Sequence, residues 1–306
     1  MSPPEKLHEI YAQQMTKRHD YGYPLYNPTS RTIIKPGVCG YIDQHGQWNP
    51  VADLTTPDEL IKKGLTPPQQ PLESAPDDCD ISWGPKCSEA VKGRRLGVEA
   101  GASAAASGIP VEAAVVYRYS SENDFGAILM TESPIWRESF YFDRPFREWV
   151  AENSASLLAV RPELREHGLW VVRWIYSTTK CSLNAWTAKE KQITVGFKAK
   201  AIGAGELGPD ADWYESSTDS GWIHSQAQEG DRKVVFLGGL HFRYKRLARS
   251  GQHLKDTSKT PKWTFRGAAD EESTVIDVDA DESYEITCTE VGKLEIPAAD
   301  ESDNDF

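Results

Sequence analysis

Hydrophobic and polar residues alternate along several stretches of this chain, and a period of two residues is typical of a β-strand. In residues 96–107, leucine, valine and a run of alanines occupy one face, and glycine, glutamate and serine occupy most of the other. After a turn at residues 108–110, residues 111–119 alternate in the same way. The two stretches predict a long hairpin that is weakly anchored, because alanine packs poorly in a sheet. Two interpretations are open: an ordinary half-buried hairpin, or a hairpin that can change its position.

A second long hairpin is predicted further along the chain. Residues 193–201 alternate, glycines follow, and residues 213–224 return with aromatic residues at both ends of their less charged face. Residues 169–176 are apolar on both faces, which predicts the central strand of a sheet. Residues 234–247 form a further apolar strand that completes the sheet.

Helical signals are fewer. Residues 5–18 form a short amphipathic pattern that we expect to dock onto the body of the protein. Asp143 is an N-cap candidate before a helix, and a helical turn over residues 162–167 ends at Gly168. The proline-rich residues 49–85 predict an irregular surface loop. The fold class is therefore α+β: a twisted, largely antiparallel sheet with two long extensible hairpins and flanking helices.

The formal net charge of −12 is concentrated at the carboxyl end of the 306-residue chain. Residues 266–306 hold 2 basic and 14 acidic side chains, whereas residues 1–265 hold 32 of each. Residues 232–265 carry nine basic side chains and one acidic one. We therefore predict a folded domain over residues 1–250, followed by a polar linker and an acidic, disordered tail over residues 251–306. Such a tail screens the basic segment before it.

No pattern of catalytic or ligand-binding residues emerges. The five cysteines show no Cys-x-x-Cys pair, the seven histidines lack metal-ligand spacing, and no glycine-rich phosphate loop follows a strand. We expect no metal, no cofactor and no enzymatic activity, and the thin aromatic interleaving of the basic run argues against nucleic acid. The first 20 residues carry charges where a signal peptide needs an apolar run. We expect a cytoplasmic protein.

The order of elements resembles that of the pore-forming domain of gasdermins, in particular the fungal gasdermin-like cell-death proteins. A long hairpin is followed by a helix closed by Gly168, a strand beginning Leu169-Trp170-Val171-Val172, a second long hairpin and the strand over residues 234–247. The resemblance implies a protein that binds anionic phospholipids, forms homo-oligomers and refolds two hairpins into a transmembrane β-barrel at the plasma membrane. It also implies regulated cell death, triggered by an activating protease or an allelic partner.

The resemblance places the inserting hairpins at residues 96–119 and 192–224. The residues expected to meet lipid are Leu96, Val98, Ala100, Ala102, Ala104, Val111, Ala113, Val115, Tyr117, Ile193, Val195, Phe197, Ala199 and Ala201. The cations expected to bind anionic lipid are Arg94, Arg95, Lys198, Lys200, Lys233, Arg243, Lys245 and Arg246. Burying a lysine at mid-bilayer costs about 2–4 kcal/mol, so the face of Lys198 and Lys200 is expected to point away from lipid.

An alternative of a different class is a soluble interaction scaffold. Residues 275–278, Val-Ile-Asp-Val, precede a run of acids and resemble a SUMO-interacting motif. Four-residue patterns of this kind arise often by chance.

Overall fold

The computed structural model of the chain describes residues 7–96, 109, 113–188, 191–198, 202–203, 206–207, 213–217, 219–247, 264–265, 271–279 and 282–292. It contains 16% helix and 51% strand. All strand pairs among the described residues are antiparallel. The fold is therefore α+β, as predicted.

A ten-stranded central sheet is built around two long strands, β10 and β17, which pair along most of their length. The residues of β10 are apolar on both faces and all but Arg173 are buried, which confirms the predicted central strand. Strands β1 and β20 also pair with β17, and β2 and β9 pair with β10. The strands of this sheet are β1 (Tyr23–Ser30), β2 (Val38–Ile42), β3 (Trp48–Asp53), β4 (Asp78–Ile81), β9 (Ile135–Ser139), β10 (Leu169–Thr178), β17 (Lys233–Arg246), β18 (Thr264–Phe265), β19 (Glu271–Asp279) and β20 (Glu282–Val291).

Four helices lie against this sheet: α1 (Leu7–Thr16), α2 (Pro57–Lys62), α4 (Arg144–Val160) and α5 (Leu164–His167). Tyr11 and Met15 of α1 are fully buried, so the expected docking of this helix onto the body is confirmed. Helix α4 packs its apolar face against β10, β19 and β20. The turn of α5 ends at Gly168, whose φ of 73° favours glycine. None of the described helices is long and apolar enough to cross a membrane.

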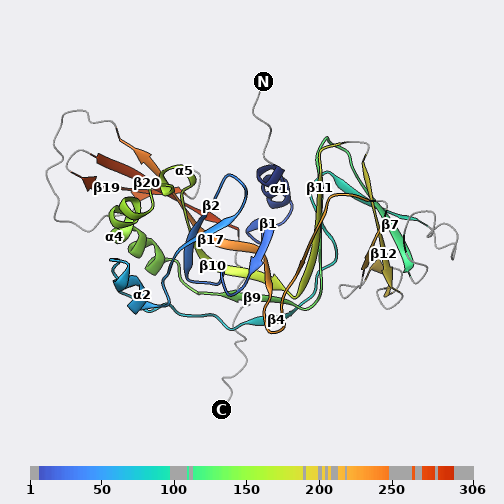
Figure 1. Ribbon diagram of the computed structural model, residues 1–306, viewed down its shortest axis with the longest axis horizontal. Coiled ribbons are helices and arrows are strands. Elements are labelled where there is room, and N and C mark those ends of the chain that lie inside the picture. Colours follow the sequence, from blue (N-terminus) through green and yellow to red (C-terminus); the bar gives the residue numbers. More distant parts are fainter. Residues whose placement is uncertain are drawn as a thin grey trace, which may run out of the picture.

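Two four-stranded sheets extend from one side of the central sheet. We call β16-β11-β8-β5 the inner sheet and β15-β12-β7-β6 the hairpin sheet. In Figure 1 the strands rise through the inner sheet, bend, and descend into the hairpin sheet at the far right. The inner sheet contains β5 (Lys86–Cys87), β8 (Gly126–Thr131), β11 (Lys180–Trp186) and β16 (Trp222–Gln226). The hairpin sheet contains β6 (Val91–Leu96), β7 (Ala113–Ser121), β12 (Gln192–Lys198) and β15 (Trp213–Glu215), and β13 (Ile202–Gly203) pairs with β14 (Glu206–Leu207) alone.

Two expectations are wrong. Residues 49–85 contain most of β3, all of α2 and β4, and the buried side chains of Leu60 and Trp83, so they are not an irregular loop throughout. The chain is also not disordered from residue 270, because β19 and β20 form a hairpin that pairs with β17. Ile286 and Cys288 of this C-terminal hairpin are fully buried. Burial of these alternating apolar residues offsets the unfavourable charge of their acidic neighbours.

Candidate functional site

The two predicted hairpins, which are far apart in the sequence, lie side by side in the hairpin sheet. Strands β6 and β7 form the first hairpin, and β12 and β15 form the second. Their inner strands, β7 and β12, are hydrogen-bonded neighbours. The first hairpin begins earlier than predicted, at Val91, and residues 97–108 lie outside the described residues.

The inner strands of the two hairpins keep one pairing register through the bend between the sheets. In the inner sheet the pairs run from Thr131↔Cys181 to Gly126↔Trp186, and the hairpin sheet resumes at Ser120↔Gln192. Five residues on each strand, 121–125 and 187–191, separate the two ladders. Because the two gaps are equal, β8–β7 and β11–β12 can become continuous without a shift of register.

The outer strands do not share this property. The first outer strand has three residues, 88–90, where β8 and β7 have six between the corresponding pairs. The last outer strand has six residues, 216–221, where β11 and β12 have ten. The predicted single arm over residues 213–224 is therefore wrong: it is divided into β15 and β16, which belong to different sheets.

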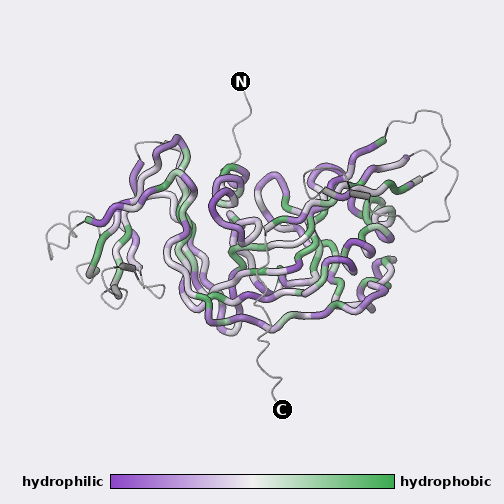
Figure 2. The backbone as a smooth tube through the Cα atoms, turned by 180° about the vertical axis from the view of Figure 1, so that it is seen from behind, coloured by the Kyte–Doolittle hydropathy of each residue, from purple (hydrophilic) through white to green (hydrophobic). Residues whose placement is uncertain are grey.

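The apolar face of the hairpin sheet is packed against the inner sheet. Val115, Ile193, Val195 and Phe197 are at most 2% exposed and form one cluster with residues of β8 and β11. Tyr117 packs against the same cluster. Leu96 and Ala113 are half-buried but lie on the opposite face, because Leu96 pairs with Val116 and a bulge pairs Ala113 with Lys198. The expectation that these two residues share one lipid-facing side with Val115 and Tyr117 is therefore wrong. In Figure 2, hydrophobic stretches recur along these strands. The remaining residues expected to meet lipid, Val98, Ala100, Ala102, Ala104, Val111, Ala199 and Ala201, lie outside the residues whose side chains are described.

Side-chain contacts cover part of the opposite face of the hairpin sheet. A Cβ on Gly196 would lie 2.5 Å from Ile109 Cγ2, so the absence of a side chain lets Ile109 pack there at 3% exposure. At the bend, the Thr194 backbone N–H donates to Asp219 Oδ2 at 2.6 Å, and the Ser216 N–H donates to the Thr194 carbonyl at 3.1 Å. The carboxylate of Asp219 thus takes the place of a backbone acceptor where the β12–β15 ladder ends.

The predicted lipid-binding cations do not gather into one patch. Arg94 and Arg95 are exposed on β6 of the hairpin sheet, whereas Lys233, Arg243, Lys245 and Arg246 lie on β17 of the central sheet. Lys198 ends β12, with its side chain outside the description, and Lys200 lies outside the described residues. The sequence analysis did not select Arg118, which pairs directly with Arg94 across β6 and β7. The sequence does place Arg118 on the polar face of an alternating strand, and that position could have identified it as a candidate.

The C-terminal hairpin covers part of the basic strand β17. Strand β20 pairs with the eight residues from Gly239 to Arg246, and this register places Glu285 opposite Lys245. Glu282 forms an ion pair with Arg246, with 3.3 Å between Oε1 and Nε. Two further ion pairs of 3.1 Å join the hairpin to the body, Glu272 with Arg147 and Glu290 with Arg173.

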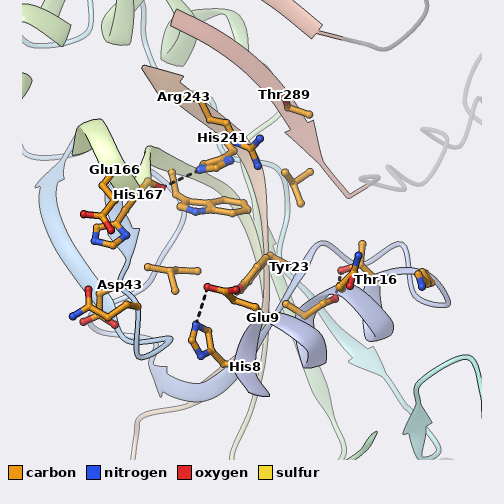
Figure 3. A pocket seen from close by; sticks show the side chains of 17 residues that line it. His8, Glu9, Thr16, Tyr23, Asp43, Glu166, His167, His241, Arg243 and Thr289 are labelled. Atoms are coloured by element: carbon orange, nitrogen blue, oxygen red, sulfur yellow. Dashed lines mark hydrogen bonds and ion pairs between the residues drawn. The ribbon is translucent and has the colours of Figure 1, made fainter. Parts of the chain in front are cut away.

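A groove of about 810 Å³ lies between α1, α5, the turn after β2, and β20 (Figure 3). In its wall the rings of Trp170 and His241 stack with centroids 4.4 Å apart. Burial lowers the pKa of His241 to about 4, so its ring is neutral at pH 7. Carboxylates such as Glu9 and cations such as Arg243 share the lining, and the groove therefore has no single charge preference.

Among the described residues, no group of three or more histidine, cysteine, aspartate or glutamate side chains is arranged to hold a metal ion. Neither a protein-family model nor a curated protein matches the sequence of this chain.

Proposed function

We propose that this chain is a gasdermin-like pore-forming protein that binds anionic membranes, oligomerises and inserts its two hairpins. The observation that carries the proposal is the single register that β8–β7 shares with β11–β12 across the bend. A transmembrane strand needs about 9–11 residues. Straightening the bend would pair residues 115–131 with residues 181–197, which exceeds that length.

The faces of the hairpins support the same proposal. Straightening exchanges the contact of Ile193, Val195 and Phe197 with the inner sheet for contact with lipid, so their apolar surface stays out of water. The alternate residues of β12, Thr194, Gly196 and Lys198, then face the aqueous side. This alternation of apolar and polar faces is the pattern of a membrane-spanning strand.

Oligomerisation has a structural basis in the edges of the hairpin sheet. Strands β6 and β15 end this sheet, and their outer edges pair with no other described strand. When β6 of one copy pairs with β15 of the next, the contact is heterologous, and such contacts form a ring when the rotation from copy to copy closes. Cell death at the plasma membrane would follow from the permeability of the resulting pore.

We propose that the C-terminal hairpin restrains this activity. It occupies the edge of β17 beside Lys245 and Arg246, two of the cations expected to bind lipid. The restraint is therefore a folded strand pair with matching ion pairs rather than a disordered acidic tail. A protease or partner that detaches the hairpin would expose both the strand edge and its cations.

A leakage assay on anionic vesicles tests the proposal. We expect Ala199→Asp to abolish leakage while the soluble fold persists, because a carboxylate on the lipid face is penalised only after insertion. Normal leakage by this variant would refute the assignment of the second hairpin.

The interaction scaffold remains the second hypothesis. Of the SUMO-interacting-like residues, Val275 is 49% exposed, but Ile276 is 7% exposed and packs in the core beneath α4. A modifier that binds by contacting these apolar side chains would have to displace β19. A scaffold releases no dye from vesicles with or without its C-terminal hairpin, so the leakage assay separates the two hypotheses.

A further inference from the structure

Two arginines lie directly opposite each other on the hairpin sheet. The register of β6 and β7 pairs Arg94 with Arg118. Alternation places both on the side away from the inner sheet, because Val91, Val115 and Tyr119 pack toward it. Residues paired in this way have Cβ atoms about 4.5–5.5 Å apart, so the two guanidinium groups can reach the same ligand.

No residue in the described part of the chain forms an ion pair with either arginine. Like charges directly opposite each other destabilise a sheet. Neither guanidinium makes an ion pair or side-chain hydrogen bond with another described residue, whereas Lys92 on the same face pairs with Glu122 at 2.6 Å. Asp219 attracts Arg118, but its carboxylate accepts the Thr194 backbone N–H instead. Among the described residues, neither guanidinium fork is therefore engaged by a hydrogen bond or an ion pair.

We infer that Arg94 and Arg118 together bind a phosphate group. A guanidinium donates two parallel N–H bonds to an oxyanion, and a phosphate monoester has enough oxygens to accept from two such forks at once. The bound anion would also relieve the repulsion between the two cations. A lipid headgroup and a free phosphate offer the same chemistry to this pair. We assign the phosphate to a lipid headgroup, and that assignment rests on the proposed function.

Arg95 provides a matched control on the same strand. It carries the same charge one residue from Arg94, and alternation points it to the other side of the sheet, where Tyr117 is its cross-strand partner. If the protein were only attracted to an anionic surface in general, Arg94 and Arg95 would contribute similarly to binding. The loss of either charge would then cost about 1 kcal/mol, which is about a fivefold loss of affinity. A specific site depends on Arg94 and Arg118 alone.

The first experiment measures binding to phosphatidylcholine vesicles that contain phosphatidic acid, whose headgroup is a phosphate monoester. We expect Arg94→Gln and Arg118→Gln each to lower affinity at least about tenfold, because each removes a charged fork. Arg95→Gln should lower it about fivefold or less. Arg118→Lys keeps the charge but loses the fork, and should resemble Arg118→Gln more than the wild type.

The second experiment measures thermal unfolding with and without inorganic phosphate at constant ionic strength. Without phosphate, Arg94→Gln and Arg118→Gln should melt at or above the wild-type temperature, because each removes a like-charge contact. Phosphate should raise the melting temperature of the wild type and of Arg95→Gln, but not of the other two variants. A merely structural role for either arginine predicts the opposite sign in the absence of phosphate.

Equal losses for all three glutamine variants, with no phosphate effect on melting, would overturn the inference. A phosphate effect on melting without a specific loss of vesicle binding would support the phosphate site and contradict the lipid source. Leakage is scored separately: specific binding without leakage refutes the proposed pore and leaves the site intact. Leakage that persists without arginine-specific binding refutes the site and leaves the pore.

Discussion

Burial controls the ionisation of His241 in the groove beneath α5. Its ring stacks on Trp170, and its Nε2–H donates to the His167 carbonyl at 3.4 Å. Burial and the nearby Arg243 lower its pKa to about 4, against an ordinary value of 6.5. The unfolded chain therefore binds a proton at a higher pH than the folded chain, and the free energy of unfolding falls as the pH drops from 6.5 toward 4.

Urea denaturation at two pH values tests this. Near pH 5.5 the histidine should reduce the free energy of unfolding by about 1 kcal/mol relative to pH 7.5. The His241→Gln variant should lose that part of the pH dependence. His19, whose pKa burial also lowers to about 4, keeps its own contribution in both proteins. An identical pH dependence in the variant would contradict the assignment.

At the scale of elements, the bend between the inner sheet and the hairpin sheet decides whether the hairpins stay folded back. Asp219 holds the Thr194 N–H, and both the Asn184 amide and the Lys191 ammonium donate to the Ser220 carbonyl, at 3.1 and 2.9 Å. These bonds hold Asp219 and Ser220 beside the beginning of β12. The bend is thus held largely by polar contacts, whereas the apolar cluster of Val195 and Phe197 holds the sheets together.

Removing the Asp219 acceptor should loosen this junction. In Asp219→Ala, the amide of Thr194 loses its acceptor, and we expect its hydrogen exchange to be about tenfold faster, since the bond contributes about 1–1.5 kcal/mol. Asp219→Asn is the matched control, because its amide oxygen still accepts the bond. Equal protection of the Thr194 amide in both variants would show that the contact does not hold the bend.

At the scale of the molecule, the hairpin sheet and the C-terminal hairpin lie at opposite ends (Figure 1). The C-terminal hairpin is joined to the body by the β17–β20 ladder, by the buried side chains of Ile286 and Cys288, and by four ion pairs among the described residues. Its removal would expose Leu240 and Phe242, which pack in the same cluster. Cutting the chain and removing the hairpin are therefore different perturbations.

A protease site introduced into residues 251–260 separates them. After cleavage we expect the C-terminal fragment to stay bound at low salt, because the ladder and the apolar contacts persist. High salt should weaken the complex, since screening acts on the ion pairs of Glu272, Glu282 and Glu290. Size-exclusion chromatography at low and high salt measures release, and leakage should rise only with release. Immediate dissociation at low salt would contradict this account.

Local pattern alone predicted much of this fold. Two-residue alternation located β12, continuous apolar runs located β10 and β17, helical spacing located α1, and a glycine located the end of α5. These features depend on contacts between residues close in sequence, or on the simple need of a strand to bury one face or both. The alternation also identified which side of β12 is apolar.

The tertiary structure decided what each apolar face packs against. The alternation of Ile193, Val195 and Phe197 is the same whether they meet lipid or another sheet, and only the bend places them on the inner sheet. The acidic composition of residues 271–291 predicted disorder, yet their alternating apolar residues fold because β17 offers an open edge and α4 an apolar surface. The Arg94–Arg118 pair likewise exists only through the register of two strands. Pairing between distant segments depends on register and available edges, and those are properties of the assembled sheet rather than of any local stretch.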